Sequence, residues 1–343
     1  MAQINKPNEY FNTLLWTGNS TDNRVITGVG FQPDWVWIKN RDAAEQNKLY
    51  DAVRGATKNI YSNLTNAEGT DANSLKSFDS DGFTLGTEGS LNGSGQDIVG
   101  WNWKANGSGV SNTDGSITST VSANTTSGFS IVSYTGTGAN ATVGHGLGIA
   151  PKFLIVKNRS SATSWGVQTS TGAGFEMNLN NDEAQTATSV YWNSTNPTSS
   201  VFSVGTNAAT NNSGDNMIAY CFAPIKGFSK FGSYEGNGNV DGPFIYTGFK
   251  PAFVIIKKYS AANDWHTHDN KRDTFNPETR YLQPNTSAVE TNDTGKALDF
   301  LSNGFKLRTT HGSHNGATGQ FFIYMAFAES PLVGTNNIPA TAR

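Results

Sequence analysis

The sequence predicts an all-β fold: three tandem antiparallel β-sandwich repeats of a jelly-roll-like type. Three observations predict this class: a strand-like stretch that occurs three times, a near-constant spacing to two later anchors, and a composition rich in turn-forming residues. Glycine accounts for 37 of 343 residues, aromatic residues for 11% and charged residues for only 15%. Few segments therefore have the composition of a long amphipathic helix.

The recurring stretch consists of a proline, one spacer, four apolar residues and a basic residue. Its copies span residues 33–39, 151–157 and 251–257. A run of aromatic and β-branched residues without alternation is typical of a strand that is covered on both faces. Proline can open such a strand because its missing N–H is not needed at the first position. We expect this stretch to form the central strand of each repeat.

The spacing of two later anchors indicates duplicated units. The proline precedes the phenylalanine of the second anchor at a nearly constant separation, from Pro33 to Phe83, Pro151 to Phe202 and Pro251 to Phe305. The last aromatic residue of the closing strand then follows that phenylalanine at a similarly constant separation, at Trp103, Phe222 and Phe327. The predicted repeats span residues 1–108, 109–227 and 228–343, each of a length that suits a β-sandwich.

Shorter strands are predicted around each recurring stretch. They lie at residues 11–17, 83–86 and 98–104 in the first repeat, at 116–122, 129–134, 202–205 and 217–224 in the second, and at 304–307 and 321–328 in the third. Residues 51–54 have the pattern of a short helical turn, and residues 89–95 that of a loop.

Charge and hydropathy exclude several classes of partner. The net charge of −3 and the absence of a Lys/Arg-rich run give no footprint for nucleic acid or an anionic membrane. No segment approaches the roughly 18 consecutive apolar residues of a membrane span, and the N-terminus has no apolar signal core. The single Cys221 lies between Tyr220 and Phe222 and is expected to be a buried free thiol.

Histidines form the most evident candidate ligand-binding group. His266 and His268 would lie on one side of an extended segment, and His311 and His314 lie in a polar loop. Two histidines and a carboxylate can hold zinc or nickel, but the first two repeats have no equivalents. We therefore expect hydrated loop histidines, with no bound metal and no cofactor.

Two tryptophans form the second candidate group. Trp165 and Trp265 follow the proline of their own repeat, Pro151 or Pro251, at an identical sequence separation, and both lie among Ser, Asn and Asp. Aromatic rings among short polar residues suit a sugar-binding loop, whereas recurrence of the position favours packing against the core. Because no Gly-x-Ser-x-Gly elbow or paired acid group is evident, we expect no enzymatic activity.

The motifs at residues 28–41, 78–86 and 324–334 resemble a domain that recurs in tailed bacteriophages, notably marine and cyanobacterial phages, in proteins labelled tail-fibre or virion structural protein. The resemblance covers all three repeats. It implies a virion component, assembled in the host cytoplasm, that has other virion proteins as partners. The resemblance implies no catalytic residues.

These observations favour a tail-fibre or receptor-binding protein that contacts host surface glycan through its inter-strand loops. A capsid decoration or fibre-linking protein is the alternative, and a polysaccharide depolymerase is a weaker one. Because each central strand is apolar on both faces, its outer face needs a cover. A neighbouring repeat, a long loop or a partner subunit can supply it, so a homo-oligomer, preferably a trimer, is a further expectation.

Overall fold

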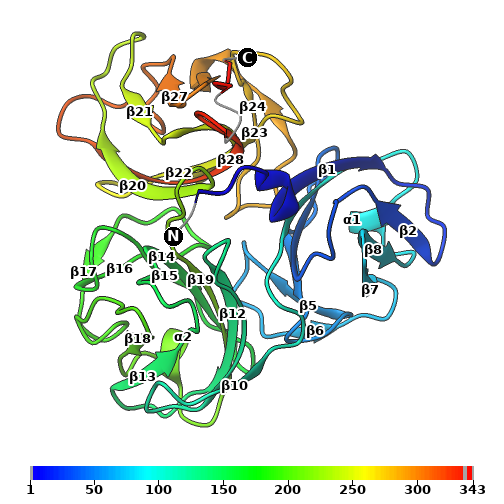
Figure 1. Cartoon of the computed structure of the whole chain (residues 1–343), viewed down its shortest axis with the longest axis vertical. Helices are drawn as coiled ribbons and strands as arrows, with labels where there is room; N and C mark the ends of the chain where they lie inside the picture. Colours follow the sequence, from blue (N-terminus) through cyan, green and yellow to red (C-terminus); the bar gives the residue numbers. More distant parts are fainter. Residues whose placement is uncertain (1–2, 335–337, 342–343) are drawn as a thin grey trace.

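The computed structural model describes residues 3–334 and 338–341. It is all-β, with several antiparallel sheets. Three large sheets surround a common centre, and each carries a smaller sheet on its outer side (Figure 1). No helix among the described residues is long and apolar enough to cross a membrane.

The first large sheet has the strand order β1-β9-β3-β4-β5-β6. These strands are β1 (Phe11–Thr17), β9 (Asp97–Trp103), β3 (Trp35–Asn40), β4 (Lys48–Asp51), β5 (Lys58–Tyr61) and β6 (Gly69–Thr70). Its small sheet has the order β2-β8-β7 and consists of β2 (Arg24–Thr27), β8 (Gly82–Leu85) and β7 (Leu75–Asp79).

The second large sheet has the order β10-β11-β12-β19-β14-β15. Its strands are β10 (Val110–Asn112), β11 (Ser119–Asn124), β12 (Phe129–Thr135), β19 (Asn216–Phe222), β14 (Phe153–Asn158) and β15 (Gly166–Gln168). Two two-stranded sheets accompany it, β13 (Ala141–Gly144) with β18 (Val201–Val204), and β16 (Phe175–Glu176) with β17 (Thr186–Ala187).

The third large sheet has the order β20-β28-β22-β23. Its strands are β20 (Ser229–Glu235), β28 (Phe321–Pro331), β22 (Phe249–Lys258) and β23 (Trp265–Asp269). Its small sheet consists of β21 (Phe244–Tyr246), β27 (Gly304–Leu307) and β26 (Leu298–Leu301), and a further pair consists of β24 (Arg280–Tyr281) and β25 (Thr291–Asn292).

Helices are few and short in the described residues: η1 (Pro7–Glu9), α1 (Gly89–Asn92), α2 (Ala208–Asn211) and η2 (Thr294–Lys296). The side chains of Glu88 and Asn207 accept hydrogen bonds from the first turns of α1 and α2. The sequence predicts a loop where α1 lies, because such a short helix cannot show a periodic pattern.

The central strands of the three large sheets follow one order: β1-β9-β3-β4, β12-β19-β14-β15 and β20-β28-β22-β23. The recurring stretch forms β3, β14 and most of β22, and it pairs in each case with the last strand of its sheet. All residues of β3 and β14 are buried, as a strand covered on both faces requires.

Alternate residues of these strands enter two different cores. In β3, Val36 and Ile38 pack between the first large sheet and its small sheet. Trp35 and Trp37 point the other way, into a central core that all three large sheets share. The same division holds for β14 and β22: the central core takes Phe153, Ile155, Phe253 and Ile255, and the outer cores take Leu154, Val156, Val254 and Ile256.

Three equivalent rings meet in the central core. Trp103, Phe222 and Phe327 each lie opposite the first aromatic residue of the recurring stretch in their own sheet. Their ring centroids are 6.5 Å apart for Trp103 and Phe222, 6.0 Å for Phe222 and Phe327, and 5.6 Å for Trp103 and Phe327. We call these residues the central triangle. It joins three sheets from distant parts of the chain.

The central core also supplies the cover that the sequence requires for the second face of each recurring strand. That cover is the neighbouring large sheets of the same chain. The expectation of a homo-oligomer rested on this face, and no partner subunit is needed to bury it.

Truncation of one central ring tests how far the three sheets depend on each other. Phe222→Ala removes a buried ring that contacts Phe129 at 4.8 Å and Trp35 at 5.7 Å. We expect it to lower the free energy of unfolding by about 3–5 kcal/mol, with one cooperative transition for the whole chain. The measurement is denaturant unfolding followed by tryptophan fluorescence and far-UV circular dichroism.

Phe244→Ala is the matched control, because Phe244 is 44% exposed. It should change the free energy of unfolding by less than about 1 kcal/mol. A Phe222→Ala protein in which part of the chain melts early while the rest keeps its original midpoint would contradict the shared core.

Candidate functional site at the junctions between the large sheets

The three large sheets meet at three junctions, which we name by the sheets that they join: 1–2, 2–3 and 3–1. The two candidate tryptophans lie at these junctions and are buried, Trp165 with 0% and Trp265 with 1% of its surface exposed. The Trp165 indole N–H donates to the backbone oxygen of Tyr61, at 2.8 Å, across the 1–2 junction. The Trp265 indole N–H donates to the backbone oxygen of Asn178, at 3.1 Å, across the 2–3 junction.

The first large sheet makes the corresponding contact with a different residue. Asn47 follows Pro33 at the same sequence separation at which the two tryptophans follow their prolines. Its side-chain N–H₂ donates to the backbone oxygens of Gln283, at 3.1 Å, and Thr286, at 2.8 Å, across the 3–1 junction. In each case a side chain of one sheet's segment donates a hydrogen bond to backbone oxygens of the preceding sheet's segment, so the three contacts form a closed circle. Both tryptophans are buried and pack at the junctions, the role that the recurrence of their position favoured over sugar binding.

Three buried lysines follow the same circle. Lys39, Lys157 and Lys257 close the recurring stretch and are each 0% exposed. Their ammonium groups donate to backbone oxygens of the preceding sheet's segment: Ser287 at 3.1 Å, Thr65 at 3.0 Å and Asp182 at 3.1 Å. Burial lowers the pKa of each lysine to about 8.

A buried ionic network fills the 1–2 junction. The carboxylate of Glu68 accepts hydrogen bonds from Arg159, at 2.8 and 2.9 Å, and pairs with Arg54, at 3.2 Å. Arg54 also pairs with Asp51, whose carboxylate accepts a hydrogen bond from the Tyr220 hydroxyl at 2.7 Å. Burial by itself would raise the pKa of Glu68, but the two arginines lower it.

The 3–1 junction repeats this network. Glu290 accepts hydrogen bonds from Arg41, at 2.7 and 2.9 Å, and pairs with Arg272, at 3.2 Å. Arg272 donates to Asp269 at 2.6 Å, and the Trp101 indole N–H donates to the same carboxylate at 3.0 Å. The pKa of Glu290 is lowered because the two arginines outweigh the effect of burial.

The 2–3 junction has neutral residues at the same positions. The backbone N–H of Gln185 donates to the Tyr259 oxygen at 2.9 Å, as Glu68 does to Arg159, also at 2.9 Å, and Glu290 to Arg41, at 2.8 Å. Gln185 and Tyr259 thus replace the glutamate and the first arginine. Thr169 is in the position of Asp51 and Asp269, and Gly172 is in the position of Arg54 and Arg272. Met325 is in the position of Tyr220 and Trp101.

A hollow of about 390 Å³ opens at this neutral junction. We call it the junction hollow. The second sheet's segment and the third sheet's segment each contribute half of its lining, which consists of Thr171, Phe175, Gln185, Ser233, Tyr259 and Ser260. Phe175 is 39% exposed, and Ser233 and Ser260 are also exposed. Its volume lies in the range of about 300–1,000 Å³ that small-ligand sites occupy.

The ring of Tyr259 is held in place beside the junction hollow. It stacks on Phe321, with centroids 6.1 Å apart and an angle of 28° between the rings. The Tyr259 backbone N–H donates to the Phe321 oxygen at 3.0 Å. The Phe321 N–H in turn donates to the Ser260 hydroxyl at 2.9 Å. This rim of the hollow is therefore preorganised.

The four candidate histidines gather in one cluster on the outer side of the third large sheet. His266, His268 and His314 are buried, while His311 is exposed. The Nε2 atoms of His268 and His314 lie 2.9 Å apart, and the hydroxyl of Ser313 lies between His311 and His314, 2.8 and 2.7 Å from their Nδ1 atoms. Burial lowers the pKa of His266, His268 and His314 well below the usual value, which favours their neutral forms.

The histidine cluster is not arranged as a metal centre. In the described part of the chain, no three His, Cys, Asp or Glu side chains are placed so that they could hold a metal ion together. The sequence pattern was right that His266 and His268 share one side of a strand, β23. The expectation of hydrated loop histidines was wrong for three of the four, because His266 and His268 lie in β23 and these two and His314 are buried.

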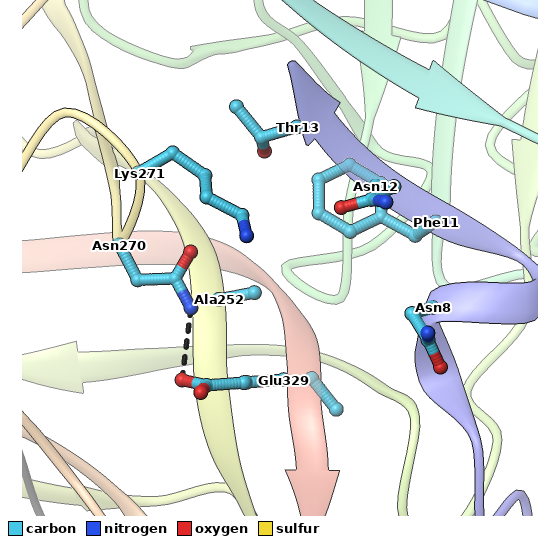
Figure 2. Close-up of a pocket in the computed structure, with 9 residues that line it drawn as sticks. Asn8, Phe11, Asn12, Thr13, Ala252, Asn270, Lys271 and Glu329 are labelled. Carbon is cyan, nitrogen blue, oxygen red and sulfur yellow. Dashed lines mark hydrogen bonds between the residues drawn. The ribbon is translucent and has the colours of Figure 1, made fainter. Parts of the chain in front are cut away.

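A second, smaller pocket lies at the 3–1 junction (Figure 2). Asn12 and Thr13 of β1 line one side, and Asn270 and Lys271, after β23, line the other. The Asn270 side chain donates to Glu329 at 2.8 Å. With a volume of about 90 Å³, this pocket has room for a few waters but not for a sugar ring or a larger ligand.

Residues 6–331 match a family described as a domain of unknown function, DUF7483. The chain belongs to this family. The DUF7483 match begins just before η1 and ends with the last residue of β28, so it includes all three large sheets and every junction. Comparison with curated proteins and with solved structures found no match.

Sequence reasoning missed the residues of the junction hollow. The signal was present at the eighth position after each proline, where the chain has Arg41, Arg159 and then Tyr259. The change from arginine to tyrosine at this position affects one junction of the DUF7483 chain, the 2–3 junction. Its partner positions lie at unequal distances from the proline, because the loops differ in length, so sequence alone did not align Gln185 with Glu68 and Glu290.

Removing one carboxylate from an ionic junction tests the importance of these networks. Glu290→Gln removes the carboxylate that Arg41 and Arg272 share in a largely buried place, so that Arg272 keeps only Asp269 and Arg41 only the more distant Asp97, at 3.8 Å. We expect the free energy of unfolding to fall by about 3–5 kcal/mol, as measured by urea denaturation.

Asp22→Asn is the control, because Asp22 is 48% exposed and forms a surface pair with Lys76. Water screens this pair, so the substitution should leave the urea midpoint nearly unchanged. Equal losses in the two variants would show that the buried network contributes no more than a surface pair.

The buried lysines should make the free energy of unfolding depend on pH in the alkaline range. Their folded pKa of about 8 lies below the usual unfolded value of about 10.4. Between these values the unfolded chain holds more protons, so the free energy of unfolding should rise with pH. Each lysine contributes up to about 1.4 kcal/mol per pH unit.

Lys157→Met should reduce that slope between pH 8 and 9.5, whereas Lys226→Met, at an exposed lysine, should leave it unchanged. The difference between variant and parent isolates the lysine, because both retain Cys221 and the tyrosines. Urea denaturation at several pH values measures it. An unchanged slope in Lys157→Met would contradict the lowered pKa.

Proposed function

We propose that the protein is a non-enzymatic recognition component on the exterior of a bacteriophage particle, as part of a tail fibre or receptor-binding assembly. It consists of three duplicated jelly-roll-like sandwich units, at residues 1–108, 109–227 and 228–343, closed into one rigid body by the central core. The resemblance of its motifs to phage domains supports the location. Its partners there are other virion proteins and a host surface glycan.

The observation that carries the recognition role is the neutral 2–3 junction. Two junctions are sealed by buried arginine and carboxylate networks. The third has the corresponding backbone hydrogen bond, between Gln185 and Tyr259, but has the junction hollow in place of the network. A departure from an otherwise repeated structural device is what a binding function imposes on one copy of a duplicated unit.

The chemistry of the junction hollow suits binding without catalysis. Its lining supplies aromatic rings, hydroxyls and an amide. These groups orient a ligand through stacking and hydrogen bonds. The arginines and carboxylates of the other junctions are paired with one another across the sheets.

A capsid decoration or fibre-linking role is the second candidate, and the edge strand β21 favours it. Phe244 is 44% and Tyr246 is 52% exposed, on either side of the buried Ile245. β21 is at the edge of its sheet and could contact another virion protein through these rings.

Immuno-electron microscopy of the phage particle separates these roles. Antibody label at the tail tip would support recognition, and label over the capsid faces would support decoration. Particles that bind no antibody, although the protein is present in infected cells, would overturn the proposal that it is a virion component.

A further inference from the structure

We infer that the junction hollow binds a neutral oligosaccharide, with sugar rings packed against Phe175 and Tyr259. This inference rests on the proposed recognition function and names the ligand class and the residues. Neither candidate tryptophan contributes, because both are buried.

The hollow occupies space that side chains fill elsewhere. At the other junctions, a second arginine reaches toward the glutamate from the position that Gly172 holds here, as Arg54 does toward Glu68 at 3.2 Å. A first arginine does the same from the position of Tyr259, as Arg159 does at 2.8 Å. Gly172 lies outside the lining of the hollow, whereas Tyr259 and Gln185 line it in place of the first arginine and the glutamate, so these two changes account for the open site between the two sheets.

The lining has the groups that sugar recognition uses. Phe175 is 39% exposed, and the C–H face of a pyranose packs on such a ring as other apolar groups do. Thr171, Ser233 and Ser260 bring hydroxyls to the same place. The side-chain oxygen of Gln185 has no hydrogen-bond partner within the described part of the chain. Because that oxygen has almost no exposed surface, the groups that face a sugar are the Phe175 ring and the exposed serines.

Charge selects a neutral sugar over an acidic one. None of the six lining residues carries a charge. The neighbouring side chains of Glu176 and Glu183 are both acidic, and burial followed by the charge of Glu183 raises the pKa of Glu176. A uronic or sialic acid carboxylate would meet no arginine or lysine in the lining, and it would approach negative charge.

The test is binding of the full chain to an array of defined oligosaccharides. The array holds neutral chains of glucose, galactose, mannose and N-acetylglucosamine, together with uronic-acid and sialylated chains of matched length. We expect binding to at least one neutral class and none to the acidic chains, with affinities then measured by isothermal titration calorimetry. Binding of acidic chains alone, or of no sugar on the array, would overturn the inference.

Variants assign the binding to the junction hollow. Phe175→Ala and Tyr259→Ala should each weaken it about tenfold or more. Tyr246→Ala is the control, since Tyr246 is an exposed aromatic residue outside the hollow, and its binding should be unchanged. Equal affinities in all three variants would place the sugar elsewhere and overturn the assignment.

The double variant Gln185→Glu with Tyr259→Arg guards against loss of binding through misfolding. It places a glutamate and an arginine where the other junctions have them, so the thermal midpoint should not fall while sugar binding is lost. Retained sugar binding in this variant would contradict the site. Because these measurements use the isolated protein, their failure would leave the virion location intact, and antibody labelling would test that location separately.

Discussion

The packing of Trp103, Phe222 and Phe327 in the central triangle is the contact on which the rest of the structure depends. Each ring belongs to a different large sheet, so the inner face of each sheet is buried only when the other two are present. This dependence explains why the recurring strands are apolar on both faces. It also turns three similar segments into one body with a fixed set of junctions.

The junctions show how a repeated polar device supports that core. Lys39, Lys157 and Lys257 bridge every junction, whereas the arginine and glutamate networks bridge two. Buried charges need complete pairing, and the 2–3 junction avoids that need by using neutral residues at the network positions. The junction hollow lies at the same junction. The proposed binding site and the ionic networks therefore occupy equivalent positions at different junctions.

Much of the local structure could be predicted from the sequence. The recurring stretch, the strand at Phe11–Thr17 and the buried Cys221 follow directly from composition and pattern. The circular arrangement could not be predicted, because contacts such as Trp165 with Tyr61 join residues whose proximity no local pattern encodes. The junction hollow could not be predicted for the same reason: it arises where Gln185 and Tyr259 replace a glutamate and an arginine, and that comparison needs the register of the sheets.

The most direct measurement of the shared core is the behaviour of residues 109–227 alone, observed by analytical ultracentrifugation and heteronuclear NMR. This segment would expose Phe153, Ile155, Tyr220 and Phe222 on the face that the other sheets cover. The shared core predicts that it will not form a stable folded monomer, but will remain disordered or associate through that face. A monodisperse monomer with dispersed amide resonances and cooperative unfolding would contradict the account.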